Sequence, residues 1–388
     1  MRPTPRLAIT AVFAAFGVIG GLWSGSVPSV AKRVGLDEYQ LGLAFTVFLL
    51  AIVLAMTAAG YLARHVSSRR VLLVTVPAMA ILGVAMLAST SVAMFVPALI
   101  AFGVAQGLTD VFMNAEGSSI ETELGRPVFT GLHAAVSVSV AIFAIAGSLL
   151  AAGVGPAASA PIVLMAGLGA TWLVAKAIGD RQISAPASAS ARVAAAGPSA
   201  WWPLAMLGLA VGFDNAGEMA ALLWSARLLD EAAPSLAVIA GIGPAFYAAC
   251  NALVRLNGDR IRARIGDRPL VIVSLLVATA GFIGVGLFSG FAARVAAFAV
   301  VGFGTACVIP CMFAIAANSD PEARARRLGF VSMIAGPPRV LTPFLFGAIA
   351  QRASMGEAFG LCSALMIGAL VLFLLSAARM QAPVPIAA

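Results

Sequence analysis

The stretch Gly60-Tyr-Leu-Ala-Arg64-His65-Val-Ser-Ser-Arg69-Arg70 fills a short gap between two hydrophobic segments. A similar basic stretch fills another such gap roughly 200 residues later, and reads Gly258-Asp259-Arg260-Ile-Arg262-Ala-Arg264-Ile-Gly266-Asp267-Arg268. The triplets Leu22-Trp23-Ser24 and Leu223-Trp224-Ser225 recur at nearly the same separation. This repetition predicts a chain made of two similar halves. A membrane protein built in this way can hold a site where the halves meet.

The composition indicates that most of the surface faces lipid. Hydrophobic residues make up 61% of the 388 positions, charged residues make up 10%, and the mean hydropathy is +1.01. Soluble domains carry about 25% charged residues. The net charge of +8 does not indicate a nucleic-acid partner, because the basic residues lie in short gaps between apolar runs. That distribution is typical of cytoplasmic loops in membrane proteins.

The apolar runs have the length that a helix needs to cross a bilayer, roughly 20 residues. They are continuously apolar and do not alternate with polar residues, which excludes a transmembrane β-barrel. We therefore expect an all-α membrane protein with two six-helix bundles, 1–178 and 201–388, joined by a cytoplasmic linker at 179–200 that is rich in Ala, Ser and Pro. The twelve expected spans are 7–30, 40–62, 71–90, 93–115, 128–153, 158–178, 202–226, 235–256, 269–288, 291–316, 328–350 and 356–377.

The distribution of charge also predicts the orientation. With the N-terminus inside, most of the 24 Lys and Arg residues fall on the cytoplasmic side, so both termini are expected there. The N-terminal run resembles a secretory signal that ends at Ser29-Val-Ala31. However, it is longer than a typical signal core, and Gly17, Gly21 and Gly25 recur every four residues, which favours a first helix that another helix packs against closely.

Residue motifs identify the superfamily that this chain resembles. The twelve spans, the central linker and the paired basic loops resemble the major facilitator superfamily over essentially the whole chain. In that superfamily the loop between the second and third helices usually reads Gly-x-x-x-Asp-Arg-x-Gly-Arg-Arg. The first copy matches at Gly60, Arg69 and Arg70 but has Arg64 in place of Asp, whereas the second copy keeps Gly258-Asp259-Arg260. The resemblance implies that these loops, with Arg255 and Arg264, gate the cytoplasmic ends of helices during transport.

A finer resemblance is to the fucose-permease-like branch and its bacterial inner-membrane relatives. Gly107-Leu-Thr-Asp110-Val-Phe-Met113-Asn114 is similar to a segment of that branch in which an acidic residue is followed four positions later by Asn. His133, Ser137 and Gly336-Pro337-Pro338 also fit these relatives, but the span 7–30 lacks a carboxylate near Trp23. The resemblance implies a multi-pass protein of the bacterial inner membrane, most simply a monomer, that binds a small-molecule substrate. It also implies a central cavity lined by the spans 7–30, 93–115, 202–226 and 291–316.

Polar residues inside the spans are the candidate site, because a charge buried in a membrane costs several kcal/mol unless it is paired or hydrated. Gln106, Asp110 and Asn114 are four residues apart and form one stripe. Asp214 and Glu218 are one turn apart with Asn215 beside them, and Arg339 lies about 16 Å into its span. Asp110 is the first candidate for a proton-carrying carboxylate and Glu218 the second.

Each candidate also has a structural interpretation. Asp110 could lie near the headgroups, Arg339 could pair with Asp214 or Glu218 within the second half, and His133 could lie at the membrane edge. Trp23 and Trp224 could stack on a substrate or serve as interfacial anchors. All four cysteines fall inside spans, so no disulfide framework is expected. Cys307 and Cys311 share a helical face, and packing explains them better than a metal site does.

The sequence gives no support for an enzyme. Lys32 and Lys176 are the only lysines and neither lies in a Gly-rich phosphate loop, so we expect no nucleotide, cofactor or metal on this chain. The energy source would then be an ion gradient or the gradient of the substrate itself. Three interpretations remain: a proton-coupled secondary transporter, a uniporter or exchanger of the same fold, and a membrane scaffold or sensor. Convergence of Asp110, Asp214 and Arg339 on one aqueous cavity would separate the scaffold or sensor from the other two interpretations.

Overall fold

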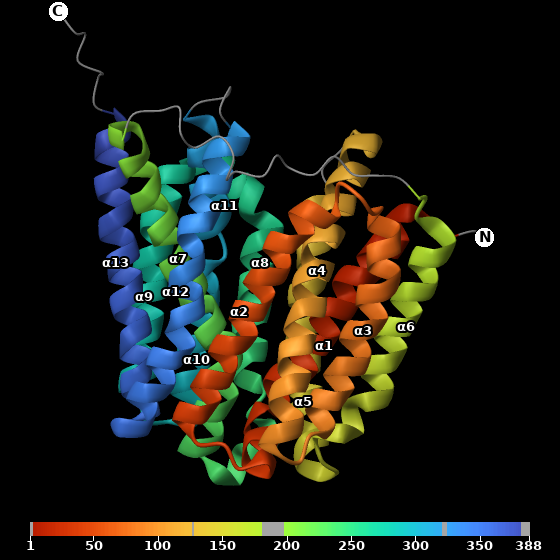
Figure 1. The fold of residues 1–388 in the computed structure, drawn as a ribbon. Coiled ribbons are helices and arrows are strands. Elements are labelled where there is room, and N and C mark those ends of the chain that lie inside the picture. The colour runs from red at the N-terminus through yellow and green to blue at the C-terminus, as the bar shows by residue number, and fades with distance from the viewer. Residues whose placement is uncertain (1–2, 126–127, 181–197, 320–323, 382–388) are drawn as a thin grey trace, which may run out of the picture.

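The computed structural model describes residues 3–125, 128–180, 198–319 and 324–381, and its regular elements in these ranges are all helical (Figure 1). The first half contains α1 (Pro5–Val34), α2 (Glu38–Leu62), α3 (Ser68–Ala88), α4 (Val92–Leu124), α5 (Phe129–Gly153), the short 3-10 helix η1 (Pro156–Ser159) and α6 (Ala160–Ala177). The second half contains α7 (Pro198–Ala232), the 3-10 helix η4 (Pro234–Ile239), α8 (Ile242–Ile265), α9 (Asp267–Leu287), α10 (Phe291–Thr305), α11 (Val308–Asn318), α12 (Arg324–Arg352) and α13 (Met355–Gln381). The expected linker falls mostly on residues 181–197, which lie outside the described ranges.

The packing partners of the helices repeat between the two halves. In the first half α1 packs on α5 and α6, α2 on α4, and α3 on α4 and α6. In the second half α7 packs in the same way on α12 and α13, α8 on α10, and α9 on α10 and α13. The halves meet through α2 against α12 and α5 against α8, two contacts that a two-fold axis interchanges. The repeat read from the sequence is therefore a repeat in space.

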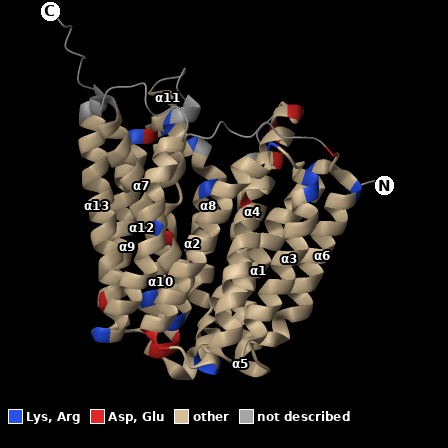
Figure 2. Cartoon of the chain, viewed as in Figure 1, with Lys and Arg blue, Asp and Glu red and all other residues tan. Residues whose placement is uncertain are grey.

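Not every helix of the bundle is strongly apolar. Among the described residues, ten segments are long and apolar enough to cross a membrane. α7 and α8 fall short of that hydropathy because they carry polar residues such as Asp214, Glu218, Asn251 and Arg255, yet they lie alongside the others in the same bundle (Figure 1). Charged residues otherwise gather near the two ends of the helices (Figure 2). The two helices outside the ten thus hold Asp214, Glu218 and Arg255, while Asp110 and Arg339 lie on α4 and α12, which are among the ten.

The tenth expected span, 291–316, is broken into α10 and α11 at Ala306–Cys307. Pro310 explains the break, because a proline lacks the N–H that would bond the carbonyl four residues earlier and its ring clashes with that carbonyl. That carbonyl belongs to Ala306, and it accepts a hydrogen bond from Nε of Arg255 at 3.4 Å. The break therefore exposes a backbone acceptor inside the bundle, and an arginine of α8 occupies it.

Two other boundaries differ from the sequence-based expectation. The eighth span was expected at 235–256, whereas η4 covers Pro234–Ile239 and α8 runs from Ile242 to Ile265. Gly241, Gly243 and Pro244 disfavour a regular helix at its start, so the α-helix is displaced along the chain. α4 continues to Leu124, nine residues beyond the expected end, because Glu116 packs inside the half and is 0% exposed.

The glycines of α1 allow the close packing that their spacing predicted. A Cβ atom on Gly17 would lie 2.4 Å from the carbonyl oxygen of Val136, and one on Gly25 would lie 2.0 Å from that of Ala144. Both neighbours belong to α5. α1 is a continuous helix inside the bundle, so its glycines place the backbones of α1 and α5 in direct contact.

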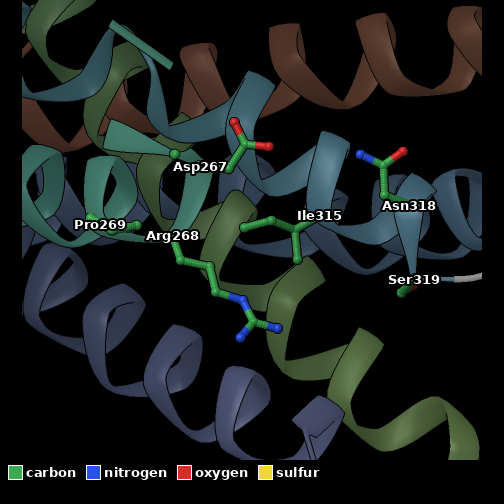
Figure 3. Close-up of a pocket in the computed structure, with 7 residues that line it drawn as sticks. Asp267, Arg268, Pro269, Ile315, Asn318 and Ser319 are labelled. Atoms are coloured by element: carbon green, nitrogen blue, oxygen red, sulfur yellow. The ribbon is translucent and has the colours of Figure 1, made fainter. Parts of the chain in front are cut away.

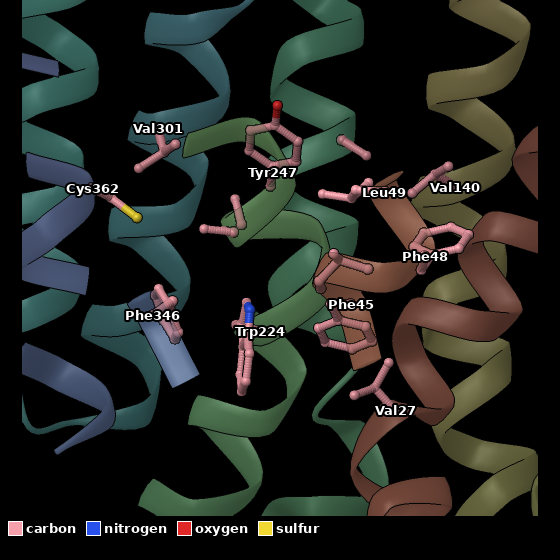
Figure 4. Packing of buried hydrophobic residues seen from close by; sticks show 14 of the residues in the cluster. Val27, Phe45, Phe48, Leu49, Val140, Trp224, Tyr247, Val301, Phe346 and Cys362 are labelled. Atoms are coloured by element: carbon pink, nitrogen blue, oxygen red, sulfur yellow. The ribbon is translucent and has the colours of Figure 1, made fainter. Parts of the chain in front are cut away.

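The two halves are joined at the end of the bundle that holds the α1–α2 connection, which we call the closed end. Its core is aromatic: the ring of Trp224 lies 4.8 Å from that of Phe346 and 5.4 Å from that of Phe45, which belongs to the other half (Figure 4). Nearby, a Cβ atom on Gly42 of α2 would lie 2.5 Å from the carbonyl oxygen of Pro343 of α12. Backbone contact and buried rings therefore seal this end.

Ion pairs across the halves reinforce the closed end. Arg227 of α7 contacts Glu38 of α2 at 2.5 Å, with side chains 17% and 21% exposed. Asp230 of α7, 5% exposed, contacts Lys32 of α1 at 2.8 Å and Arg227 at 3.8 Å. Because Asp230 is nearly buried, these pairs are less screened by solvent than surface pairs. Residues of both halves must separate here if this end is to open.

Candidate functional site

The polar stripe of α4 has the arrangement that its four-residue spacing predicted. Nδ2 of Asn114 donates to Oδ1 of Asp110 at 2.9 Å and to the backbone carbonyl of Asp110 at 2.8 Å, which fixes the carboxylate. Both side chains are half-buried. Oε1 of Gln106 and Oδ1 of Asn114 have no hydrogen-bond partner among the described residues. The stripe thus presents one oriented carboxylate between two unused acceptors.

Arg339 of α12 brings a positive charge from the second half to this stripe. Its guanidinium group lies within electrostatic reach of Asp110 and also of Glu218 on α7. The side chain is half-buried, and its Nε has no hydrogen-bond partner among the described residues. An arginine between carboxylates of two halves therefore retains a donor for a further polar group.

Glu218 is the centre of a polar network inside the second half. Its Oε1 accepts from Nη2 of Arg255 at 3.3 Å and from Nδ2 of Asn251 at 3.4 Å. Asn251 also lies 3.3 Å from Oγ1 of Thr305, which lies 3.4 Å from the hydroxyl of Tyr247. Since Arg255 also binds the carbonyl of Ala306, the network connects α7 and α8 to the break between α10 and α11.

Asp214 differs from Asp110 and Glu218 because no described residue forms a hydrogen bond with it. It is 0% exposed, and neither carboxylate oxygen has a hydrogen-bond partner in the part of the chain that the structure describes. Glu218 lies one turn further along α7, and Glu218 and Arg255 are both within electrostatic reach. Asn215 is half-buried, and its Oδ1 also has no partner among the described residues.

The two tryptophans are buried among other aromatic rings. Trp23 is 4% exposed and packs on Phe45 and Phe95, while Trp224 is 0% exposed. The interpretation of Trp23 and Trp224 as interfacial anchors was wrong, because the rings fill the core of the closed end, whereas stacking on a substrate stays a prediction. His133 of α5 is half-buried and lies edge-on to Phe13 of α1 at 5.3 Å, so it packs inside the first half.

The expected gating residues are helical in most cases, not in loops. Gly60 lies in α2, and Arg69 and Arg70 in the first turn of α3, where they contact the end of α6 through the carbonyl of Ala175 and the carboxylate of Asp180. Gly258, Arg260 and Arg264 lie in the last turns of α8, where Nη1 of Arg260 lies 3.5 Å from Oδ1 of Asn257. The side chain of Asp259 lies outside the described residues.

The expected position of Arg255 has to be corrected. This residue was expected at the cytoplasmic loop, but α8 continues to Ile265, so Arg255 lies ten residues, about 15 Å, before the end of the helix. Its ion pair with Glu218 places it in the polar network of the second half. The spacing of Asn251 and Arg255, four residues apart in an otherwise apolar stretch, is the signal that could have indicated this.

Two surface cavities lie away from the central charges. One of about 500 Å³ is lined by the start of α9 and the end of α11, including Arg268 and Asn318 (Figure 3). The other, of about 480 Å³, lies at the closed end beside Lys32 and Asp230. Neither is lined by Asp110, Asp214 or Arg339. The sequence alone does not predict the ion pairs of the closed end, because nothing in it pairs residues of α1 and α2 with α7.

Comparison with known proteins shows the family. The chain is 31% identical to an uncharacterised MFS-type transporter of Yersinia pestis over 355 residues, which cover 89% of this chain and 88% of that protein. It is 26% identical to the membrane protein MosC of Rhizobium meliloti over 92% of this chain and 87% of that one. No family model matches the chain. This chain belongs to the major facilitator superfamily and is a multi-pass membrane transporter.

Solved structures show the same fold. The nucleoside transporter NupG, as its D323A mutant, superposes with a TM-score of 0.73 over 97% of this chain and 100% of that chain, at 14% identity. A bacterial homologue of the human lysosomal transporter Spinster, in an inward-facing and occupied conformation, gives a TM-score of 0.65 at 15% identity over 97% and 95% of the two chains. The two six-helix bundles are therefore those of the superfamily.

Proposed function

We propose that this protein is a proton-coupled secondary transporter that works by alternating access, with its substrate bound between Asp110 and Arg339. The observation that supports this most is the position of these two groups. They come from opposite halves and lie within electrostatic reach, while the ion pairs and aromatic packing that join the halves lie at the closed end. Rocking of the halves about such a site would expose it to each side in turn.

The balance of charge supports proton coupling. Among the described residues of this region, the carboxylates of Asp110, Asp214 and Glu218 face the guanidinium groups of Arg255 and Arg339. One carboxylate is left without a matching positive charge, and a charge without a partner is costly in a membrane interior. One bound proton would balance the set. A uniporter or exchanger would have no need of that proton, and it remains the alternative.

The unused groups point to a small polar solute with an acidic function. Nε of Arg339 is a donor suited to a carboxylate or phosphate, and the free oxygens of Gln106, Asn114 and Asn215 suit hydroxyl or amino groups. A scaffold or sensor would have no use for unused donors and acceptors gathered from both halves. We further propose a bacterial inner-membrane location with both termini cytoplasmic. The closed end then faces outward.

A binding screen followed by an uptake assay tests this proposal. Purified protein is heated with organic acids, amino acids, sugars and lipophilic cations, and a bound ligand raises the melting temperature. Arg339→Gln should remove the shift given by acidic ligands, whereas Arg352→Gln, on the exposed end of the same helix, should keep it. In proteoliposomes the ligand found should accumulate in response to a pH gradient, and a protonophore should abolish this. Uptake that ignores both would contradict proton coupling and favour the uniporter.

A further inference from the structure

The carboxylate of Asp214 is the least compensated polar group in the described interior. Its side chain is 0% exposed, and both oxygens lack a hydrogen-bond partner there. The other two central carboxylates have partners: Asp110 has Asn114 and the nearby Arg339, while Glu218 has Arg255 and Asn251. An ionised carboxylate needs donors or a counter-charge when it is removed from water. Asp214 therefore fits this position only as a neutral acid.

The polar groups near Asp214 that could bind it are bound to other residues. Arg255 is the positive group in electrostatic reach, but its guanidinium is bound to Glu218 and to the carbonyl of Ala306. Tyr247 of α8 is directed to Thr305. The remaining titratable side chains in the interior of the described helices packed against α7 are Cys250 of α8, Arg339 of α12, Cys307 and Cys311 at α11, and Cys362 of α13.

We propose that Asp214 carries the coupling proton, at a site inside the second half that is separate from the substrate site between the halves. In the conformation described here Asp214 is protonated and buried. In the alternate conformation it loses the proton to water, and Arg255 transfers from Glu218 to the newly charged Asp214. The proton is thus bound by one arrangement of the α7–α8–α10 network and released by the other. Asp110, rather than carrying the proton, orients substrate together with Arg339.

The proposal fixes the sign of a pH effect that needs no substrate. The conformation with Asp214 buried binds the proton more tightly, so low pH favours it and the closed end stays shut. Raising the pH removes the proton and shifts molecules towards opening of that end. For one linked proton, the ratio of the two conformations changes by up to about tenfold per pH unit.

A cysteine at the closed end reports this equilibrium. Ser148 of α5 is 4% exposed, lines the cavity at the closed end and lies 2.7 Å from where a Cβ atom on Gly241 would be, so a Ser148→Cys thiol becomes more accessible when the halves separate there. The native cysteines are buried. The full-length protein in nanodiscs is labelled with a membrane-impermeant maleimide over a range of pH. Each rate is divided by the rate for Ser148→Cys combined with Asp214→Asn at the same pH, which removes the pH dependence of the thiol itself.

The expected result is a normalised rate that rises with pH in the Ser148→Cys protein, by up to about tenfold per unit. It should rise equally with Asp110→Asn added, because Asp110 is not the proton site. A flat ratio would overturn the proposal. So would a rise that Asp110→Asn removes, because Asp110 would then be the titrating group.

The role of Asp214 in transport rests on the proposed function and is measured in a separate experiment. Asp214→Asn should abolish pH-driven accumulation but spare equilibrium exchange. If substrate accumulation by the unmodified protein does not respond to a pH gradient, the proposed proton coupling is wrong. The labelling experiment still decides whether Asp214 is the titrating group.

Discussion

Glu218 is the residue on which the charges of the second half converge. It receives Arg255 and Asn251 directly and lies within electrostatic reach of Arg339. Asp214, one turn away, receives neither a hydrogen bond nor a direct ion pair among the described residues. Two carboxylates that look equivalent in the sequence thus have different surroundings, because Arg255 binds Glu218 and the carbonyl of Ala306 and makes no hydrogen bond to Asp214.

This contrast predicts a difference in stability between two amide substitutions. Glu218→Gln leaves the guanidinium of Arg255 without its carboxylate, and a hydrogen bond to a charged group contributes about 1.5–3 kcal/mol. Asp214→Asn removes no bond and should leave stability almost unchanged. Denaturation of the purified proteins in detergent measures both, with Glu357→Gln at an exposed position as the control. Equal losses in Glu218→Gln and Asp214→Asn would contradict the assigned partners.

At the residue scale the sequence predicted which polar side chains lie in the interior more reliably than what they contact. Spacing placed Gln106, Asp110 and Asn114 on one face, and the structure confirms it. Spacing could not tell that Arg255 belongs with Glu218, because that pairing depends on how far α8 continues beyond it. The two tryptophans were misread for a related reason: an aromatic ring near the end of a span looks the same whether it faces lipid or another helix.

At the scale of elements, the start of α3 is held to the end of α6 by Asp180. Its carboxylate binds Arg70 at 2.8 Å, and the hydroxyl of Ser67, followed by Arg70, lowers the pKa of Asp180 below its ordinary value of 3.8. This contact is complete above the ordinary pKa and is lost as the pH falls through the lowered one. Acidification from about pH 5 to pH 3 should therefore speed amide hydrogen exchange in the first turn of α3 relative to the intrinsic exchange rate of an unfolded chain at the same pH.

The matched variant for that measurement is Asp180→Asn, which has no carboxylate to titrate. Its exchange in the first turn of α3 should be faster than that of the unmodified protein at pH 5 and similar to it at pH 3. Identical exchange at both pH values would show that the contact does not hold α3 to α6.

The ion pair between α2 and α7 predicts a charge-swap result. Glu38→Arg places two guanidinium groups together at the closed end, so labelling of Ser148→Cys should increase because the halves separate there. Adding Arg227→Glu restores opposite charges and should return the labelling towards its original rate. If the double substitution labels as fast as the single one, this pair does not hold the end closed.

At the scale of the whole molecule, the duplication in the sequence predicted the architecture. A repeat of about 200 residues, together with twelve apolar runs, indicated two bundles, and the same helix pairs recur in both halves. The sequence did not reveal which end is closed. That depends on Gly42 meeting α12 and on charges from α1, α2 and α7, which are contacts between segments that are distant along the chain. The hydropathy of the sequence does not indicate which end of the bundle is closed.

Transport by alternating access requires the two halves to separate at the closed end. A reversible cross-link across that end prevents the separation. The rings of Tyr39 on α2 and Phe344 on α12 lie 5.6 Å apart across this end. With both replaced by cysteine and joined by a short thiol cross-linker that reduction cleaves, uptake of the ligand found in the thermal screen should stop. It should return after reduction, while each single-cysteine variant stays active throughout. Full uptake by completely cross-linked protein would contradict alternating access in this chain.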